Sequence, residues 1–248
     1  MFSWKMPVLA GFLLAAAPLQ ALDLSQMTDA ERAAFREEVR AYLMENPQVI
    51  LDAVQALESR QAQQQAQADI QLVADNLDAL VNDGFSWVGG NPEGDITLVE
   101  FLDYRCGYCR RAHNEVAELL SRDGNIRWVV KEFPILGEQS LIASRFAVAT
   151  KQIAGDEAYS LVHDALMTMN SDVTERGLSR LGRTLGLDVA PILDHMNSED
   201  VSAELRATRA LAQRLRISGT PTFVVQDELV RGYLPAADML SIVEDKRG

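Results

Sequence analysis

The segment ITLVEFLDYRCGYC, residues 96–109, joins a run of strand-forming residues to two cysteines three positions apart. The run from Ile96 to Leu102 is rich in branched and aromatic side chains, which predicts a β-strand. Beyond the cysteines, apolar residues recur at helical spacing from Arg110 to Leu120 and predict a helix. Cys106 would then lie at the N-terminal end of this helix, where a Cys-x-x-Cys pair is typical of thiol–disulfide chemistry.

The two cysteines are expected to take different roles. Unpaired amide N–H groups and the helix dipole favour the thiolate of Cys106, which we predict to attack a substrate disulfide. Cys109 lies about one turn further on and is predicted to resolve the mixed disulfide by attacking Cys106. The pair would therefore alternate between a dithiol and a redox-active disulfide.

A Cys-x-x-Cys pair can also be half of a zinc site, which needs two further ligands. The chain has three histidines, His113, His163 and His195. His113 follows Cys109 by four residues and could complete a Cys-Cys-His set for a soft metal. The residues favour redox chemistry without a resident metal or a cofactor, and a soft-metal-binding or chaperone module is the alternative.

Downstream of the motif the sequence predicts a second strand, a helical stretch, a hairpin and a final helix. The second strand runs from Ile126 to Phe133, and no strand signal interrupts the helical periodicity of residues 139–215. The hairpin and the final helix cover Thr222 to Val225, Leu229 to Tyr233, and Ala236 to Glu244. These elements predict an α/β domain at residues 84–248, which begins with the turn-rich junction GGNPEGD at residues 89–95.

Residues 22–83 predict a helical N-terminal arm. From Leu24 to Asp83 there is no glycine and one proline, Pro47, so two helices or one kinked helix are expected, with Asn46 as the cap of the second. The centre of the arm, QAQQQAQ at residues 61–67, is polar all round. We therefore expect the arm to project and self-associate. A helix packed on its own domain and a flexible tether are the alternatives.

The first 21 residues resemble a secretory signal peptide. Lys5 precedes an apolar run that ends in small residues, and cleavage is expected after Ala21. An uncleaved anchor is the alternative, but Pro7 and Pro18 break the run short of the roughly 20 apolar residues that a membrane span needs. The sequence therefore predicts an exported, periplasmic protein.

The chain is acidic, with 36 Asp and Glu residues against 23 Lys and Arg residues and a net charge of −13. Nucleic acid is excluded as an expected partner, because phosphate binding needs clustered positive charge.

The order of these elements resembles the thioredoxin fold as elaborated in DsbA-like proteins, over residues 85–248. Gly219-Thr220-Pro221, just before the hairpin, is similar to the loop that carries a cis-proline facing the Cys-x-x-Cys in that superfamily. The resemblance implies a cis peptide at Pro221 and leaves the backbone of Thr220 available to pair with an extended substrate. It also implies a thioredoxin-like fold with a helical insertion at residues 139–215.

The resemblance further implies roles for Glu100 and for the dipeptide between the cysteines. DsbA-like proteins carry a buried glutamate at the place of Glu100, where a pKa raised by burial would let the carboxyl relay a proton to or from Cys109. Exposure of Glu100 to solvent, or a structural pair with Lys131, is the alternative. Gly107 and Tyr108 form the variable dipeptide that tunes the thiolate, and we expect both to contact substrate.

A helical arm joined to a DsbA-like domain resembles the ScsC-like and Com1-like exported proteins. This resemblance implies a periplasmic disulfide isomerase or reductase that acts as an oligomer on exported proteins with cysteines and is served by a membrane redox partner. A monomeric oxidase that donates disulfides is the alternative, because the same two sulfurs support both directions.

Overall fold

The computed structural model describes residues 27–248, so the predicted signal segment lies outside the described residues. The chain divides into two compact units between Ser59 and Arg60. Within residues 27–248, no helix is both long and apolar enough to cross a membrane.

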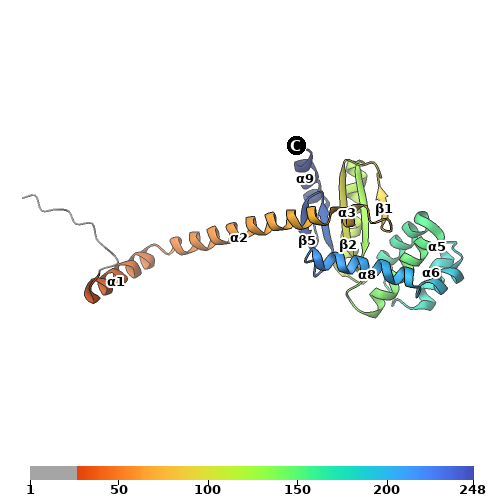
Figure 1. Cartoon of the computed structure of the whole chain (residues 1–248), viewed down its shortest axis with the longest axis horizontal. Helices are drawn as coiled ribbons and strands as arrows, with labels where there is room; N and C mark the ends of the chain where they lie inside the picture. The colour runs from red at the N-terminus through yellow and green to blue at the C-terminus, as the bar shows by residue number, and fades with distance from the viewer. Residues whose placement is uncertain (1–26) are drawn as a thin grey trace, which may run out of the picture. The chain divides into compact units, whose positions relative to one another are not determined.

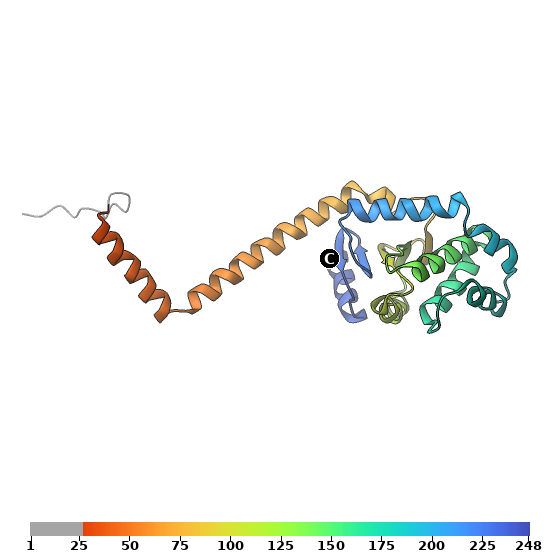
Figure 2. The same ribbon diagram turned by 90° about the horizontal axis from the view of Figure 1, so that it is seen from below.

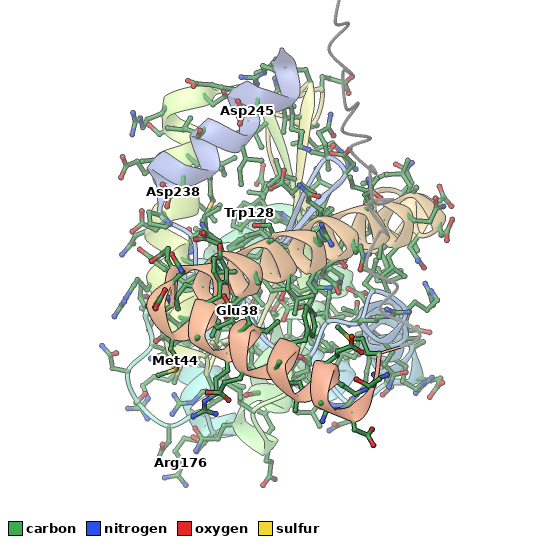
Figure 3. The ribbon with its side chains drawn as sticks, turned by 90° about the vertical axis from the view of Figure 1, so that its left-hand side faces the viewer. Glu38, Met44, Trp128, Arg176, Asp238 and Asp245 are labelled. Atoms are coloured by element: carbon green, nitrogen blue, oxygen red, sulfur yellow. The ribbon has the colours of Figure 1, made fainter. Side chains whose placement is uncertain are left out.

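The described part of the first unit is helical. Helix α1, Asp29–Glu45, starts at a capping box in which the Thr28 side chain accepts from the backbone N–H of Glu31 and the Glu31 carboxylate accepts from Thr28. The chain then breaks before helix α2, Gln48–Asp75, as Pro47 predicts. Asn46 caps the end of α1, where its side-chain amide donates to the carbonyl oxygen of Tyr42, and its own carbonyl accepts from the backbone N–H of Val49 in α2. No residue of α1 is buried, and Figure 3 shows its side chains, with Glu38 and Met44 labelled.

The second unit is built on a five-stranded sheet in the order β1-β3-β2-β4-β5 (Figure 1). Strands β2 and β3 are parallel, and the other neighbouring pairs are antiparallel. The strand bounds are Trp87–Gly90 for β1, Ile96–Leu102 for β2, Ile126–Glu132 for β3, Thr222–Val225 for β4 and Glu228–Arg231 for β5. The sequence did not predict β1, which reaches into the stretch expected to be a turn-rich junction.

Helices cover both faces of this sheet. One face packs against helix α4, Gly107–Asp123, helix α5, Glu138–Thr168, and helix α9, Ala236–Arg247. The other face packs against the end of α2, helix α3, Leu77–Val81, and helix α8, Glu199–Arg214, which lies along that side in Figure 2. Because side chains alternate along a strand, Leu98 and Leu102 belong to the first core, and Val99 and Phe101 belong to the second.

The stretch between β3 and β4 is helical. It consists of α5, which is kinked at Gly155, followed by helix α6, Glu175–Thr184, helix α7, Val189–His195, and α8. Gly155 has φ 86° and ψ −178°, a conformation open to glycine because it has no Cβ.

Residues 60–83, which we expected in the arm, belong to the second unit. Val73 and Leu80 are buried in the core beside α8. Asp69 accepts two hydrogen bonds from the Arg231 guanidinium, at 2.6 and 2.9 Å. Apolar burial and a bidentate ion pair thus attach the end of α2 to the sheet.

Candidate active site

Cys106 lies at the start of α4, where the sequence predicts it. It is the N-cap residue of the helix, with its backbone N–H donating to the Asp103 carbonyl oxygen at 3.0 Å and its own carbonyl accepting from Arg110 at 3.1 Å. Both cysteines are free thiols, and Cys106 is 8% exposed while Cys109 is fully buried. The sulfur that can meet a substrate is therefore that of Cys106.

The surroundings of Cys106 favour its thiolate. A hydrogen bond from the Cys109 thiol is the largest cause that lowers the pKa of Cys106 to about 5, followed by the Thr220 side chain and the backbone N–H groups of Cys109 and Tyr108, while burial opposes the shift. The two backbone N–H groups are among those that a helix N-terminus leaves unpaired. At neutral pH the attacking sulfur is already ionised.

The pKa of Cys109 is shifted in the opposite direction. Its donation to Cys106 raises the pKa of the Cys109 thiol well above its ordinary value, and burial and the nearby charge of Glu100 add to the rise. Cys109 therefore keeps its proton while it stabilises the Cys106 thiolate, and it needs a proton acceptor before it can attack.

The loop before β4 faces Cys106. The Thr220–Pro221 peptide is cis, as the resemblance implied. In the thiol form, Cys106 Sγ donates to the Thr220 carbonyl oxygen at 3.1 Å. A surface pocket beside this loop is lined by Ser218, Gly219, Thr220, Pro221, Thr222, Arg231 and Gly232. The loop and the reactive sulfur are thus in direct contact.

Glu100 is buried in the sheet, with 1% of its surface exposed. Its Oε2 atom accepts from Trp128 Nε1 at 3.2 Å, and its Oε1 atom has no hydrogen-bond partner among the described residues. Burial raises the pKa of Glu100 to about 8. The alternatives for Glu100 are wrong: it is not exposed, and Lys131 pairs in register with Phe101, on the opposite face of the sheet. Lys131 instead donates to Asp83 Oδ2 at 2.6 Å.

An aromatic and cationic rim adjoins the cysteines, and the sequence predicted only part of it. Tyr108 is 59% exposed, and a Cβ on Gly107 would meet nothing within 4 Å. The guanidinium of Arg111 lies 5.6 Å from the ring centroids of both Tyr108 and Tyr233. Arg111 and Tyr233 are far apart in sequence, and no local signal links them.

A buried polar network around Glu132 was also not predicted. Glu132 accepts hydrogen bonds from Tyr104, Ser144 and Tyr159, at 2.6 to 2.7 Å. Burial raises the pKa of Glu132 to about 7, although these hydrogen bonds favour its carboxylate. The acid in Lys-Glu-Phe-Pro ends a strand that is otherwise mostly apolar, and that is the sequence signal that could have found it.

The Cys-Cys-His metal set is not assembled. Among residues 27–248, the group of three ligand-type side chains that lies close enough to share an ion is His113, His163 and Asp164, without a cysteine. His195 contacts Gln152 instead, with 2.7 Å between its Nε2 atom and the amide oxygen.

Two family models match this chain. Residues 97–244 match the DSBA-like thioredoxin domain, and residues 31–64 match the N-terminal domain of the copper resistance protein ScsC.

Similar proteins include two solved structures. A thioredoxin-like oxidoreductase from Silicibacter pomeroyi DSS-3 is 45% identical, with a TM-score of 0.64 over 68% of this chain and 96% of that chain. BcfH from Salmonella enterica Typhimurium is 26% identical, with a TM-score of 0.72 over 88% of this chain and 97% of that chain. These matches confirm an α/β thioredoxin-like fold preceded by a helical N-terminal region.

A curated relative, the Na(+)/H(+) antiporter NhaA 3 of Salinispora tropica, is 30% identical over 138 residues. The match covers 56% of this chain and 21% of the antiporter, so this chain corresponds to about a fifth of that protein.

Proposed function

Because this chain belongs to the family of DSBA-like thioredoxin domains, we propose that it exchanges disulfides in exported proteins through Cys106 and Cys109. The observation that carries the proposal is the position of Cys106, a sulfur of lowered pKa at a helix N-terminus that faces the loop of Thr220 and Pro221. The solved Silicibacter pomeroyi protein of similar sequence is described as an oxidoreductase, which supports the proposal.

The exchange takes two steps. The Cys106 thiolate attacks one sulfur of a substrate disulfide, and the other substrate sulfur leaves as a thiolate. Cys109 then loses its proton and attacks Cys106 Sγ, which releases the reduced substrate and leaves a Cys106–Cys109 disulfide. Run in reverse, the same steps donate the disulfide.

Glu100 is the proposed proton relay for the second step. It lies on the face of the sheet that packs against α4, and its charge raises the pKa of Cys109. Because burial raises the pKa of Glu100 to about 8, both its protonated and its ionised form are accessible near neutral pH. The carboxylate would accept the Cys109 proton during reduction of a substrate and return it when a disulfide is donated.

We propose isomerisation or reduction as the main direction, because of the arm. Phe35, Val39 and Tyr42 lie at helical spacing on α1 and are 44%, 41% and 55% exposed. Such an exposed apolar stripe supports association with the same stripe of other copies of the chain. The match of residues 31–64 to the ScsC N-terminal domain supports a common role for this arm in the two proteins. An assembly would hold several Cys106 sulfurs around one misfolded chain, which raises their effective concentration.

The proposed location is the periplasm, after export by residues 1–21, with a membrane redox partner that keeps the cysteines reduced. The structure of a Salmonella protein described as periplasmic and thioredoxin-like, 26% identical, supports this location.

Two forms of ribonuclease A, used as substrates, distinguish isomerase activity from oxidase activity. Scrambled ribonuclease, which carries wrong disulfides, regains activity only by shuffling, whereas reduced ribonuclease needs new disulfides. We expect catalytic amounts of the reduced protein to reactivate the scrambled form. Three results together would show that the protein is a disulfide-donating oxidase instead. These are reactivation of reduced ribonuclease alone, a monomeric solution mass, and cysteines that are fully oxidised in the native compartment.

A further inference from the structure

Three ligand-type side chains meet where α4 packs against α5. His113 comes from α4, and His163 and Asp164 come from α5. One ligand atom from each lies within 4.8 Å of the other two. His113 Nε2 is 3.5 Å from Asp164 Oδ1, and the His113 and His163 ring centroids are 5.4 Å apart.

His163 carries an unused nitrogen in the protein interior. The residue is 1% exposed, and its Nε2 atom has no hydrogen-bond partner among the described residues. Its ring stacks on Trp87 and Tyr159, with centroids 6.3 and 5.9 Å away. A buried nitrogen without a hydrogen-bond partner lowers the stability of the folded protein. A ligand bound at His163 Nε2 would remove this cost.

The hydrogen bonds of Tyr104 decide which nitrogen of His163 carries the proton. The Tyr104 hydroxyl donates to Glu132 Oε1 at 2.6 Å, so its oxygen is left to accept from His163 Nδ1, 3.1 Å away. The proton therefore sits on Nδ1, and Nε2 has a free lone pair. A histidine whose far nitrogen donates to an oriented oxygen has the usual arrangement of a metal ligand.

We propose that His113, His163 and Asp164 bind a divalent transition metal ion, such as zinc, that joins α4 to α5. Two imidazoles and a carboxylate are a donor set that zinc accepts, with water as the fourth ligand. The Asp164 side chain is 61% exposed, so the ion and the water can enter from solvent and the carboxylate can move inward to the bond length of about 2.1 Å. The site contains no sulfur and is separate from the redox pair.

The test measures zinc binding by equilibrium dialysis in a Cys106→Ser/Cys109→Ser chain, which removes thiolate ligands from the measurement. We expect one equivalent of zinc, and at least tenfold weaker binding after His113→Gln or Asp164→Asn. His195→Gln removes the remaining histidine of the chain as a matched control and should leave the affinity unchanged. His163→Gln should likewise weaken binding at least tenfold, with circular dichroism to verify its fold.

Cobalt substitution and thermal unfolding give independent readouts. Cobalt should show ligand-field absorption without a thiolate charge-transfer band, and zinc should raise the melting temperature of the double-serine chain but not of its Asp164→Asn form. Failure of the double-serine chain to bind an equivalent of zinc would overturn the proposal. So would equal zinc affinity in the His113→Gln, Asp164→Asn and His195→Gln chains.

Discussion

The Sγ atom of Cys106 lies 3.1 Å from the carbonyl oxygen of Thr220, a residue 114 positions further along the chain. This contact places the reactive sulfur against a backbone segment that an extended substrate can pair with. The hydrogen-bond donors around the sulfur lower the pKa of Cys106, and this pKa can be measured by titration.

The first prediction concerns the titration of Cys106. Alkylation of the reduced protein by iodoacetamide should be half-maximal near pH 5, because the pKa of Cys106 is lowered to about 5. Cys109→Ala removes the largest cause and should raise this pKa. Cys109→Ser keeps a hydroxyl donor and should raise it less. A titration near the ordinary cysteine value of 9.0 in the unsubstituted protein would contradict the account.

The folding stability of the reduced protein should depend on pH because Cys106 ionises at a lower pH in the folded state. The pKa of Cys106 is lower in the folded state, so the unfolded state binds more protons between about pH 5 and pH 9. The stability of the reduced protein relative to Cys106→Ala should therefore rise between about pH 5 and pH 9 and be lost as the pH falls toward 5. Urea unfolding of both proteins across this range measures the difference, and a difference that does not vary with pH would contradict it.

Glu100→Gln should slow release of the mixed disulfide without shifting the titration of Cys106. The amide cannot accept the Cys109 proton, whereas the donors to Cys106 stay in place. Quenched-flow trapping of the mixed disulfide measures the rate. Glu204→Gln is the matched control, because burial raises the pKa of this acid too, to about 7, and it lies in α8. Equal release rates for the Glu100→Gln and unsubstituted proteins would refute the relay.

Asp83→Asn should destabilise the second unit. Lys131 is fully buried and donates to Asp83 and to the Ala79 carbonyl oxygen, so the substitution leaves a buried ammonium without its counter-charge, at a cost of about 3–5 kcal/mol. Asp83→Asn with Lys131→Met should recover part of this loss.

Glu118→Gln serves as the control for Asp83→Asn. It breaks an exposed pair with Arg122 and should cost less than about 1 kcal/mol. Similar urea midpoints for the Asp83→Asn and Glu118→Gln proteins would show that the Asp83–Lys131 pair does not stabilise the domain.

Association through the arm should depend on one face of α1. Phe35→Asp with Val39→Asp places charges on the apolar stripe and should reduce the solution mass to that of a monomer in sedimentation. Arg36→Asp with Arg40→Asp has the same spacing on the same helix and should leave the mass unchanged. For truncation, removal of residues 22–59 is the suitable test, because Val73 and Leu80 of the predicted arm are buried in the domain core. A monomeric mass for the unsubstituted protein in the same sedimentation experiment would contradict the proposal that the chain forms an oligomer.

Local patterns predicted the elements that carry the chemistry. The strands at Ile96–Leu102 and Thr222–Val225 were predicted with the bounds that the structure shows, because branched and aromatic residues fill both. The helix start at Cys106 followed from the periodicity after it. Strand β1 was missed because half of it is glycine and its pairing comes from β3, some 40 positions away.

The polar partners in the core were not predictable in the same way. Lys131 pairs with Asp83 and not with Glu100, because the strand register puts it on the other face of the sheet. Sequence distance allowed His113 to join the two cysteines as an alternative metal set, but the packing of α4 on α5 places it beside His163. Such pairs depend on tertiary packing, which residue spacing does not contain.

The most direct test of the exchange mechanism traps its intermediate. Cys109→Ser, incubated with a peptide disulfide and analysed by intact and peptide mass spectrometry, should carry one peptide per chain on Cys106, released by dithiothreitol. Cys106→Ala should form no adduct and should lose exchange. Disulfide exchange that persists in Cys106→Ala, or the absence of an adduct on Cys106 in Cys109→Ser, would contradict the mechanism.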